Sequence, residues 1–383
     1  MKRSGGYIQQ ITGYKAFIPA SLPPDPAIKL DETLQNLLSR ADMSLARLDG
    51  MGYILPDVNF FIAMYVRKEA LLSSQIEGTQ ASLQDLFGHE SGEKLKNIND
   101  VSDVVNYVKA LNHGIERLDD LPMSLRLIKE IHEILMEDVR GSERKPGEFK
   151  QTQNWIGPPG CTLNDATFIP PPPHETVQAM GNIERYIHAD ARLPILIDTA
   201  LIHYQFETIH PFLDGNGRLG RLLITFYLYW KNVLHSPLLY LSYFFKRNRQ
   251  EYYDRLQMVR ETGNYEQWIA FFLKGIVETA DSAMATAKKI LELQGDHRSL
   301  LWKKKISSPI AIGMLESLFH KPYVSVNDMA REFNISFQTA STLVSQFEKA
   351  GILEEITGRK RDKRYVYAQY VKILSEGTLP GFP

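Results

Sequence analysis

Apolar residues recur at helical spacing along most of the chain, and this pattern predicts a mainly α-helical protein. The first such stretch begins with Leu34, Leu37 and Leu38 and is expected to end where glycines enter at residues 49–52. Further helices are expected at residues 58–76, 80–86, 99–117, 123–139, 174–190, 194–209, 216–232, 248–262 and 265–294. Residues 1–30, with prolines at positions 19, 23, 24 and 26, are expected to be irregular.

Residues 141–173 depart from the helical pattern. They are rich in Gly, Pro and Asn, contain short β-type stretches at 149–156 and 167–169, and end in four prolines. We expect a small hairpin-like loop that lies over the helical body. Loops of this length in compact domains usually have a function, and a proline-stiffened surface loop is the plain alternative.

The pattern changes again after about Gly295. Three expected helices, at 307–319, 325–332 and 337–350, are followed by two strand-like segments, at 352–356 and 365–367. This order is that of a winged helix-turn-helix domain. We therefore divide the chain into an N-terminal region (1–95), a central helical core (96–295) and a C-terminal winged-helix-like domain (300–383).

Composition and charge exclude several classes of protein. With 44% hydrophobic and 23% charged residues the chain suits a soluble globular protein, and its net charge of -1 gives no global attraction to nucleic acid or membranes. The single cysteine, Cys161, excludes an internal disulfide and multi-thiolate zinc sites. The N-terminus leads into no apolar run, and the apolar stretch from Leu222 to Trp230 is too short to cross a bilayer. We expect no membrane contact and a cytoplasmic location.

The densest chemistry lies in residues 210–221, His-Pro-Phe-Leu-Asp-Gly-Asn-Gly-Arg-Leu-Gly-Arg. Pro211 is expected to end the preceding helix at His210. The segment then leads into the N-terminus of the next helix, whose unpaired N–H groups favour an anion. Its glycines let a phosphate approach the backbone. Arg218 and Arg221, one turn apart, can add charge-assisted bonds to phosphate oxygens.

Two other side chains of this segment suit catalysis. Asp214 is a hard oxygen ligand for Mg²⁺, which prefers one or two carboxylates together with substrate phosphates. His210 can act near neutral pH as a general base. Taken singly, His210 would be a helix-end residue, Asp-Gly-Asn-Gly a turn, and the arginine pair part of a solvated helix face. Their combination favours phosphoryl or nucleotidyl transfer to a hydroxyl.

The same residues carry a family resemblance. His-Pro-Phe-x-Asp-Gly-Asn-Gly-Arg-x-x-Arg, matched without departure, resembles the complete motif of the Fic family, and the similarity extends over roughly residues 60–280. The resemblance implies a Fic-type helical core, a catalytic base at His210, Mg²⁺ on Asp214 and ATP as substrate. Glycine at 217 indicates AMP transfer, because the phosphorylating branch of the family carries lysine there. The implied ATP phosphate-binding residues are Gly215, Asn216, Gly217, Arg218, Leu219, Gly220 and Arg221.

The resemblance extends to an inhibitory helix. Ser73, Glu77 and Gly78 match the pattern Ser/Thr-x-x-x-Glu-Gly/Asn that many Fic proteins carry, here N-terminal to the core. It implies that Glu77 pairs with Arg221 and blocks the γ-phosphate site. From the residues alone, Glu77 is a polar residue at a helix C-terminus, where the helix dipole disfavours a carboxylate without a cationic partner.

The resemblance also suggests residues for target and adenine binding. The loop at 147–173 resembles the family's flap, whose backbone registers an extended target segment by strand addition. Thr167, Phe168 and Ile169 are the candidate edge. Tyr252 and Tyr253 are the candidates for adenine binding, although aromatic residues at such positions are more often core.

The C-terminal domain offers further partners. Its helix at 337–349 begins with small polar side chains that can read base edges. The turn after it carries a local positive patch, made of Arg359, Lys360, Arg361, Lys363 and Arg364. DNA binding, a homodimer contact and target docking are the open alternatives for this domain.

The first hypothesis is a protein adenylyltransferase. It would move AMP from Mg²⁺-ATP to a Ser, Thr or Tyr hydroxyl of a target protein, release pyrophosphate and inhibit itself through Glu77. A second hypothesis is a DNA-binding regulator whose nucleotide site is a sensor. A third keeps the site but reverses the reaction and removes AMP from a modified protein.

Overall fold

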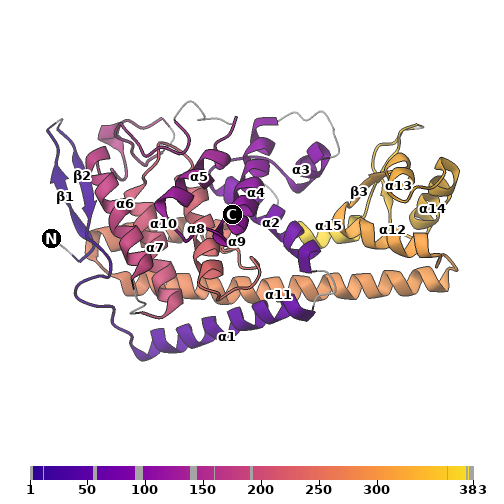
Figure 1. Ribbon diagram of the computed structural model, residues 1–383, viewed down its shortest axis with the longest axis horizontal. Helices are drawn as coiled ribbons and strands as arrows, with labels where there is room; N and C mark the ends of the chain where they lie inside the picture. The colour runs from indigo at the N-terminus through magenta and orange to yellow at the C-terminus, as the bar shows by residue number, and fades with distance from the viewer. Residues whose placement is uncertain are drawn as a thin grey trace.

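The structure, a computed structural model, describes residues 3–11, 13–54, 58–90, 98–138, 145–158, 160–189, 193–359, 361–376 and 378. The protein is mainly helical and elongated (Figure 1), and one long helix, α11 (Tyr265–Lys303), runs from the central core to the C-terminal unit. Within the described ranges, no helix is both long and apolar enough to cross a membrane.

The elements follow the expected order with a few additions. The other helices are α1 (Glu32–Ile54), α2 (Val58–Ile76), α3 (Leu83–Glu90), α4 (Ile98–Leu118), α5 (Leu125–Leu135), α6 (Pro173–His188), α7 (Ile195–Ile209), α8 (Asn216–Trp230), α9 (Ser242–Arg247), α10 (Arg249–Thr262), α12 (Pro309–His320), α13 (Val326–Glu332), α14 (Phe337–Lys349) and α15 (Ala368–Leu374). The strands are β1 (Gly5–Gln9), β2 (Lys15–Pro19), β3 (Tyr323–Ser325), β4 (Glu354–Glu355) and β5 (Arg364–Val366).

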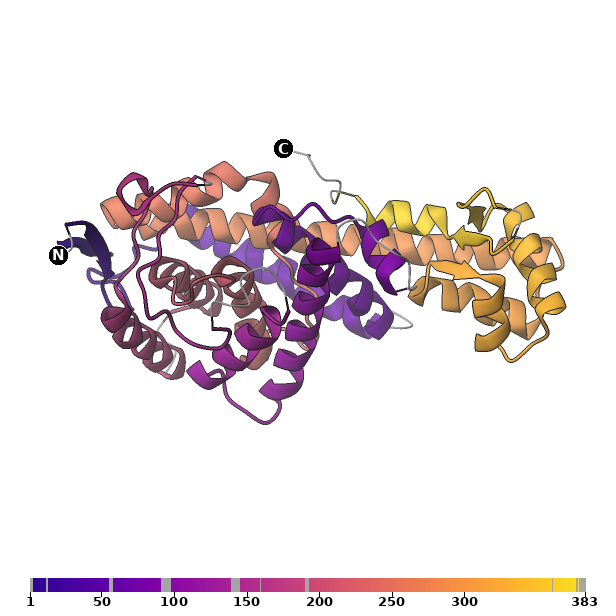
Figure 2. The same cartoon turned by 90° about the horizontal axis from the view of Figure 1, so that it is seen from above.

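Helix α1 continues through residues 49–52, where we expected it to end. Each glycine there costs the helix about 1 kcal/mol relative to alanine. However, α1 lies lengthwise against α11 (Figure 1, Figure 2), and its Leu45 and Leu48 are buried. Burying one leucine contributes about 1.5–3 kcal/mol. The expected interruption was therefore wrong, because packing outweighs local propensity.

The expectation of irregular structure at residues 1–30 was also wrong in part. Strands β1 and β2 form an antiparallel hairpin in which Gly5 lies opposite Pro19 and Gln9 lies opposite Lys15. The side chain of Phe17 is fully buried. Pro19 is the last residue of β2 and the other prolines follow it, so none of them removes a donor from inside the hairpin.

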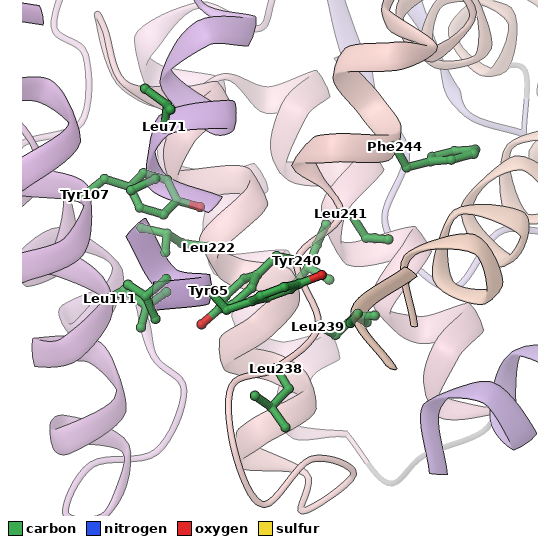
Figure 3. Packing of buried hydrophobic residues seen from close by; sticks show 14 of the residues in the cluster. Tyr65, Leu71, Tyr107, Leu111, Leu222, Leu238, Leu239, Tyr240, Leu241 and Phe244 are labelled. Carbon is green, nitrogen blue, oxygen red and sulfur yellow. The ribbon is translucent and has the colours of Figure 1, made fainter. Parts of the chain in front are cut away.

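Helices α7 and α8 form the centre of the core. Every residue from Leu196 to Ile209 is buried, and burial on all sides is typical of a central helix. Helices α2, α4 and α5 pack on α8, while α6, α10 and α11 pack on α7. Figure 3 shows part of this interior, to which α2 contributes Tyr65, α4 contributes Tyr107 and α8 contributes Leu222. The turn between α7 and α8 is thus held by rigid elements on several sides.

The loop before α6 contains little regular structure. Within its described residues, Ile156 and Phe168 form an isolated antiparallel bridge through two backbone hydrogen bonds of 2.9 and 3.0 Å. A short 3-10 helix, Leu163–Asp165, lies between them. The expected hairpin-like loop is therefore confirmed only at this one pair.

The C-terminal unit consists of α12–α15 and an antiparallel sheet with strand order β3-β5-β4. Strand β3 and helix α15 were not expected. Strand β4 is shorter than the segment expected at 352–356, and β5 begins and ends one residue before the segment expected at 365–367. Helix α11 continues beyond residue 294 because its second half is buried against this unit, where His297 Nδ1 lies 2.8 Å from the Tyr367 hydroxyl. The expected boundary at residue 95 and Lys360 of the positive patch lie outside the described residues.

Candidate functional site

The turn between α7 and α8 forms a sharp elbow. Helix α7 ends one residue before His210, which adopts left-handed backbone angles (φ 48°), so the predicted end at His210 is confirmed. Gly215 also has a positive φ, 75°, directly before α8 begins. Asn216 closes the loop, because its side chain accepts a hydrogen bond from the Phe212 N–H (2.9 Å) and donates one to the Phe212 carbonyl (2.8 Å). The N-terminus of α8 therefore opens beside the end of α7.

His132 of α5 supports this elbow. Its ring stacks on Phe212, with centroids 3.7 Å apart. Its Nδ1 accepts a hydrogen bond from the Gly147 N–H (2.9 Å), so Nε2 is the protonated nitrogen and donates to the Asp214 carbonyl (3.0 Å). Burial lowers the pKa of His132 to about 4, which keeps this tautomer neutral. The sequence reasoning missed His132, for which the signal was one polar residue on a strongly apolar helix face.

Lys150 and Asn154 join the loop before α6 to the same elbow. Lys150 Nζ donates to the carbonyls of Ile209 (3.2 Å) and His210 (3.0 Å) and to Asn154 Oδ1 (2.7 Å). Asn154 Nδ2 donates to the carbonyls of His210 (3.0 Å) and Phe212 (2.8 Å). A cation here also complements the negative end of the α7 dipole. Neither residue was identified from the sequence, because only the fold brings the two segments together.

The electrostatic environment keeps His210 neutral. Burial lowers the pKa of its ring to about 3, and the cations of Lys150 and Arg260 act in the same direction, while a backbone hydrogen bond to Glu207 opposes them. At neutral pH the imidazole is therefore in the form that can accept a proton.

The two arginines of the motif are buried, and each is paired with a carboxylate. Arg221 donates from Nη2 to Glu77 Oε1 (2.8 Å) and from Nε to Ser73 Oγ (2.8 Å). Arg218 donates from Nη1 to Asp103 Oδ1 of α4 (2.8 Å). The expected contact between Glu77 and Arg221 is thus present. Asp103 is a partner that the sequence reasoning did not find.

Glu77 lies over the N-terminal turn of α8. A Cβ atom added at Gly217 would lie 2.1 Å from Glu77 Oε1, so the absence of a side chain at this position makes room for the carboxylate. Gly78 follows with a φ of 104°, which favours glycine and turns the chain away at the end of α2. The carboxylate therefore occupies the region in which the helix N-terminus favours an anion.

Asp214 lies at the entrance of the elbow. Its Oδ1 accepts a hydrogen bond from the Gly215 N–H (2.7 Å), and the residue is partly exposed. In the described part of the chain, no group of three or more His, Cys, Asp or Glu residues could hold a metal ion. One carboxylate beside an anion site suits an ion that is held mostly by phosphates and water.

Two of the expected phosphate-binding residues contribute no free side chain to the elbow. Leu219 is fully buried, so its side chain belongs to the core. The Gly220 carbonyl lies 2.9 Å from His203 Nδ1, and a Cβ atom at Gly220 would meet the Glu207 carboxylate at 2.3 Å. Gly220 thus permits close packing of α7 on α8, and phosphate binding by Leu219 and Gly220 stays a prediction.

The candidate target edge at Thr167–Ile169 is partly occupied. Phe168 pairs with Ile156 on one side, and the Ile169 carbonyl accepts a hydrogen bond from the Phe17 N–H of β2 (2.9 Å) on the other. Thr167–Ile169 stays the candidate edge, and the N-terminal hairpin, which the sequence did not predict, lies beside it.

The two tyrosines of α10 differ in their surroundings. Tyr252 is 1% exposed, its hydroxyl lies 2.9 Å from His203 Nε2, and its ring stacks on Phe245. Tyr253 is 37% exposed. Tyr252 is therefore a core residue, and only Tyr253 offers a surface that an adenine ring could contact.

Comparison with known families matches two parts of the chain. Residues 35–116 match the model described as Fic/DOC family N-terminal, and residues 122–228 match the model described as Fic/DOC family. Among curated relatives, the protein adenylyltransferase Fic of Culex quinquefasciatus is 28% identical over 193 residues, and that of Drosophila melanogaster is 27% identical over 192 residues. Each alignment covers 50% of this chain and 35% of the relative, so the match spans about a third of their length.

Solved structures share the fold. A Fic family protein from Desulfovibrio desulfuricans G20 superposes with a TM-score of 0.59 at 19% identity, covering 89% of this chain and 97% of that one. Fic-1 (residues 134–508) from C. elegans superposes with a TM-score of 0.52 at 18% identity, covering 67% of this chain and 74% of that one. At such identities the agreement concerns the arrangement of the helices.

Proposed function

Since the chain carries a Fic/DOC family N-terminal domain and a Fic domain, we propose that it is an ATP-dependent protein adenylyltransferase that restrains itself through Glu77. It transfers AMP to a Ser, Thr or Tyr hydroxyl of a protein. The observation that carries this proposal is the elbow itself. It joins a neutral imidazole, a helix N-terminus and two arginines within one motif.

In this reaction His210 acts as the general base. A ring nitrogen takes the proton of the target hydroxyl, whose oxygen attacks the α-phosphorus of ATP. The bond from the α-phosphorus to the bridging oxygen breaks, and pyrophosphate leaves. Lys150 and Asn154 bind the carbonyl of His210 and so fix the backbone that carries the base. His132 fixes the other end of the elbow through the Asp214 carbonyl.

Asp214 would hold Mg²⁺. Its carboxylate is the one acidic group of the motif, and it lies beside the N-terminus of α8, as a metal shared with phosphates requires. Bound there, the ion would neutralise charge on the phosphates. The orientation of the Asp214 backbone by His132 Nε2 then determines where the carboxylate points.

The arginines bind the phosphates only after their present partners give way. Arg221 would hold the γ-phosphate. In the structure, Nη2 of Arg221 donates its hydrogen bond to Glu77 instead. Arg218, with the backbone N–H groups of the first turn of α8, would bind the other phosphates. The contact between Glu77 and Arg221 supports the proposal that this site is inhibited.

The type of reaction can be tested with two labels. We expect the full-length protein, incubated with a cell lysate and Mg²⁺, to transfer label to protein from α-labelled ATP and none from γ-labelled ATP. Transfer of the γ-label instead would make the protein a kinase. Loss of label from protein that had been modified beforehand, without transfer to fresh protein, would favour the reverse reaction, removal of AMP.

The cysteine content of the chain agrees with a location in the cytoplasm. Cys161 is the only cysteine of the chain, and it is a free thiol, as a reducing compartment allows. We therefore place the reaction in the cytoplasm, with a protein partner that presents a hydroxyl on an extended segment.

A second candidate function concerns the C-terminal unit, whose helices and sheet support a winged-helix assignment. The first residues of α14, Phe337, Gln338 and Thr339, are exposed. Arg359 and Arg361 are exposed on the connection between β4 and β5. A helix with an exposed N-terminus beside a basic connection suits the major groove and the phosphates of DNA.

DNA binding predicts a defined effect of charge reversal. Replacement of both Arg359 and Arg361 by glutamate in the full-length protein is expected to weaken binding to duplex DNA about tenfold or more at physiological salt, since phosphate contacts dominate such affinities. Fluorescence anisotropy measures the change. Lys288→Glu, on an exposed face of α11, serves as the control. Equal, negligible binding by all three proteins, with a dimer in ultracentrifugation, would assign the unit to self-association.

A further inference from the structure

Arg260 is a buried cation near the end of α10 with unusual partners. It is 6% exposed, and the nearby carboxylate of Glu207, which interacts with its charge, accepts none of its hydrogen bonds. Its hydrogen bonds all go to neutral acceptors: Nε to Thr208 Oγ1 (3.2 Å), Nη2 to the Glu207 carbonyl (3.4 Å) and Nη1 to Gln257 Oε1 (3.4 Å). Burial lowers its pKa below the usual value. Burying a charge without an ionic partner is costly, so a purely structural position would more readily accept a neutral residue.

The guanidinium also contacts the loop before α6. Its Cζ lies 3.7 Å from the centroid of the Phe168 ring, which is the distance of direct contact between the cation and the ring face. Phe168 is 2% exposed and is held to Ile156 by two backbone hydrogen bonds. The planar group therefore fixes the ring at the centre of the candidate target edge.

The two sets of contacts meet at one residue. Thr208 and Glu207 form the last turn of α7, directly before His210, while Phe168 belongs to the edge on which a target segment would add. The Arg260 side chain makes a hydrogen bond to Thr208 and a cation–π contact with Phe168. Arg260 thus joins the helix that carries the base to the loop that would carry the target.

We propose that Arg260 is a positioning residue for AMP transfer, which sets the place of the Thr167–Ile169 edge relative to His210. This inference rests on the proposed function. Arg260 touches neither ATP nor the reacting atoms. It acts through Phe168, and its loss therefore affects the engagement of the protein target rather than the binding of the nucleotide.

The test compares three variants in the Glu77→Gly background of the full-length protein. They are Arg260→Gln, which keeps a hydrogen-bonding group but loses the charge, Arg260→Lys, which keeps the charge but loses the planar fork, and Phe168→Leu. The probe is transfer of α-labelled AMP to lysate protein, measured over a range of lysate concentrations. Titration calorimetry with Mg²⁺-ATP gives the nucleotide affinity. Arg255→Gln is the control, since Arg255 lies on the same helix and donates its side-chain hydrogen bonds to Glu251 and Gln267.

For Arg260→Gln we expect the apparent KM for acceptor protein to rise about tenfold, with nucleotide affinity changed less than about twofold. We expect kcat to change less than KM, although the loss of this charge also acts on the ring of His210. Phe168→Leu should show the same split, and Arg260→Lys a smaller one. The double variant Arg260→Gln/Phe168→Leu should be little worse than either single variant, because each single change already removes the contact between the guanidinium and the ring. Independent, multiplicative effects, or a loss of nucleotide affinity in parallel, would overturn the inference. If the Glu77→Gly parent transfers no label at all, the proposed function itself fails. If the Glu77→Gly protein transfers label and all the variants transfer it with the same kinetics, only the positioning role of Arg260 is contradicted.

Discussion

Replacing Glu77 by glycine is expected to raise AMP transfer about 100-fold. The carboxylate binds Nη2 of Arg221 and lies above Gly217, in the region where phosphate would lie. Its removal leaves a buried guanidinium that a γ-phosphate can satisfy. A 100-fold change corresponds to about 2.7 kcal/mol. This is within the range for breaking a well-formed pair, and below its upper end because the Glu77 side chain is 40% exposed.

Two further variants separate the loss of charge from a loosened turn. Thr79→Gly perturbs the same turn, where the Thr79 hydroxyl contacts Asp103, but leaves the carboxylate in place, so it should raise transfer severalfold at most. Glu77→Gln keeps a hydrogen-bonding side chain without its charge and should be intermediate. The measurement is the initial rate of protein labelling from α-labelled ATP. An unchanged rate in Glu77→Gly, with an unchanged melting temperature, would exclude the inhibitory role.

Loss of the His210 imidazole is expected to lower transfer about 1,000-fold in the Glu77→Gly background, as is usual when a general base is removed. The backbone of His210 is left-handed, so alanine would also introduce strain there. Asparagine tolerates these angles better, and His210→Asn therefore isolates the chemistry. His235→Ala is the matched control, since His235 lies at the surface beside Asp49.

The lowered pKa of His210 predicts how the rate of AMP transfer depends on pH. With its pKa lowered to about 3, the imidazole is already unprotonated at pH 6, so the rate of the Glu77→Gly protein should stay level between pH 6 and 8. An acid limb near pH 6.5 would show that the ring titrates normally. Undiminished labelling by His210→Asn would remove His210 as the base, whatever the pH profile.

Much of the fold could be predicted from the periodicity of apolar residues. The errors of that prediction have a common cause. The apolar spacing in α7 and α8 gave their positions to within two residues at each end. The same reasoning failed for α1 at residues 49–52, where contact with α11 outweighs the cost of two glycines. It also failed for the hairpin β1–β2, which is stabilised by the burial of Phe17 beside Ile169. Local propensities are too small to decide such segments.

The candidate site divides in the same way. Its reactive residues are contiguous in the sequence, from His210 to Arg221, and so could be found by their order. Those that hold them come from elsewhere: His132 from α5, Lys150 and Asn154 from the loop, and Asp103 from α4. Of these four, His132 alone has a sequence signal, as a polar residue on a strongly apolar helix face, and the other three look like ordinary polar residues.

The sequence by itself determined the helical class, the elbow at residues 210–221 and the chemistry of its side chains, because these depend on spacing within a few turns of the chain. Tertiary structure alone decided which charges meet. It placed Glu77 on Arg221 and Asp103 on Arg218, lowered the pKa of His210 by burial, and brought β2 beside the Thr167–Ile169 edge. Burial and the pairing of distant groups depend on the packing of segments far apart in the chain, and no local pattern encodes that packing.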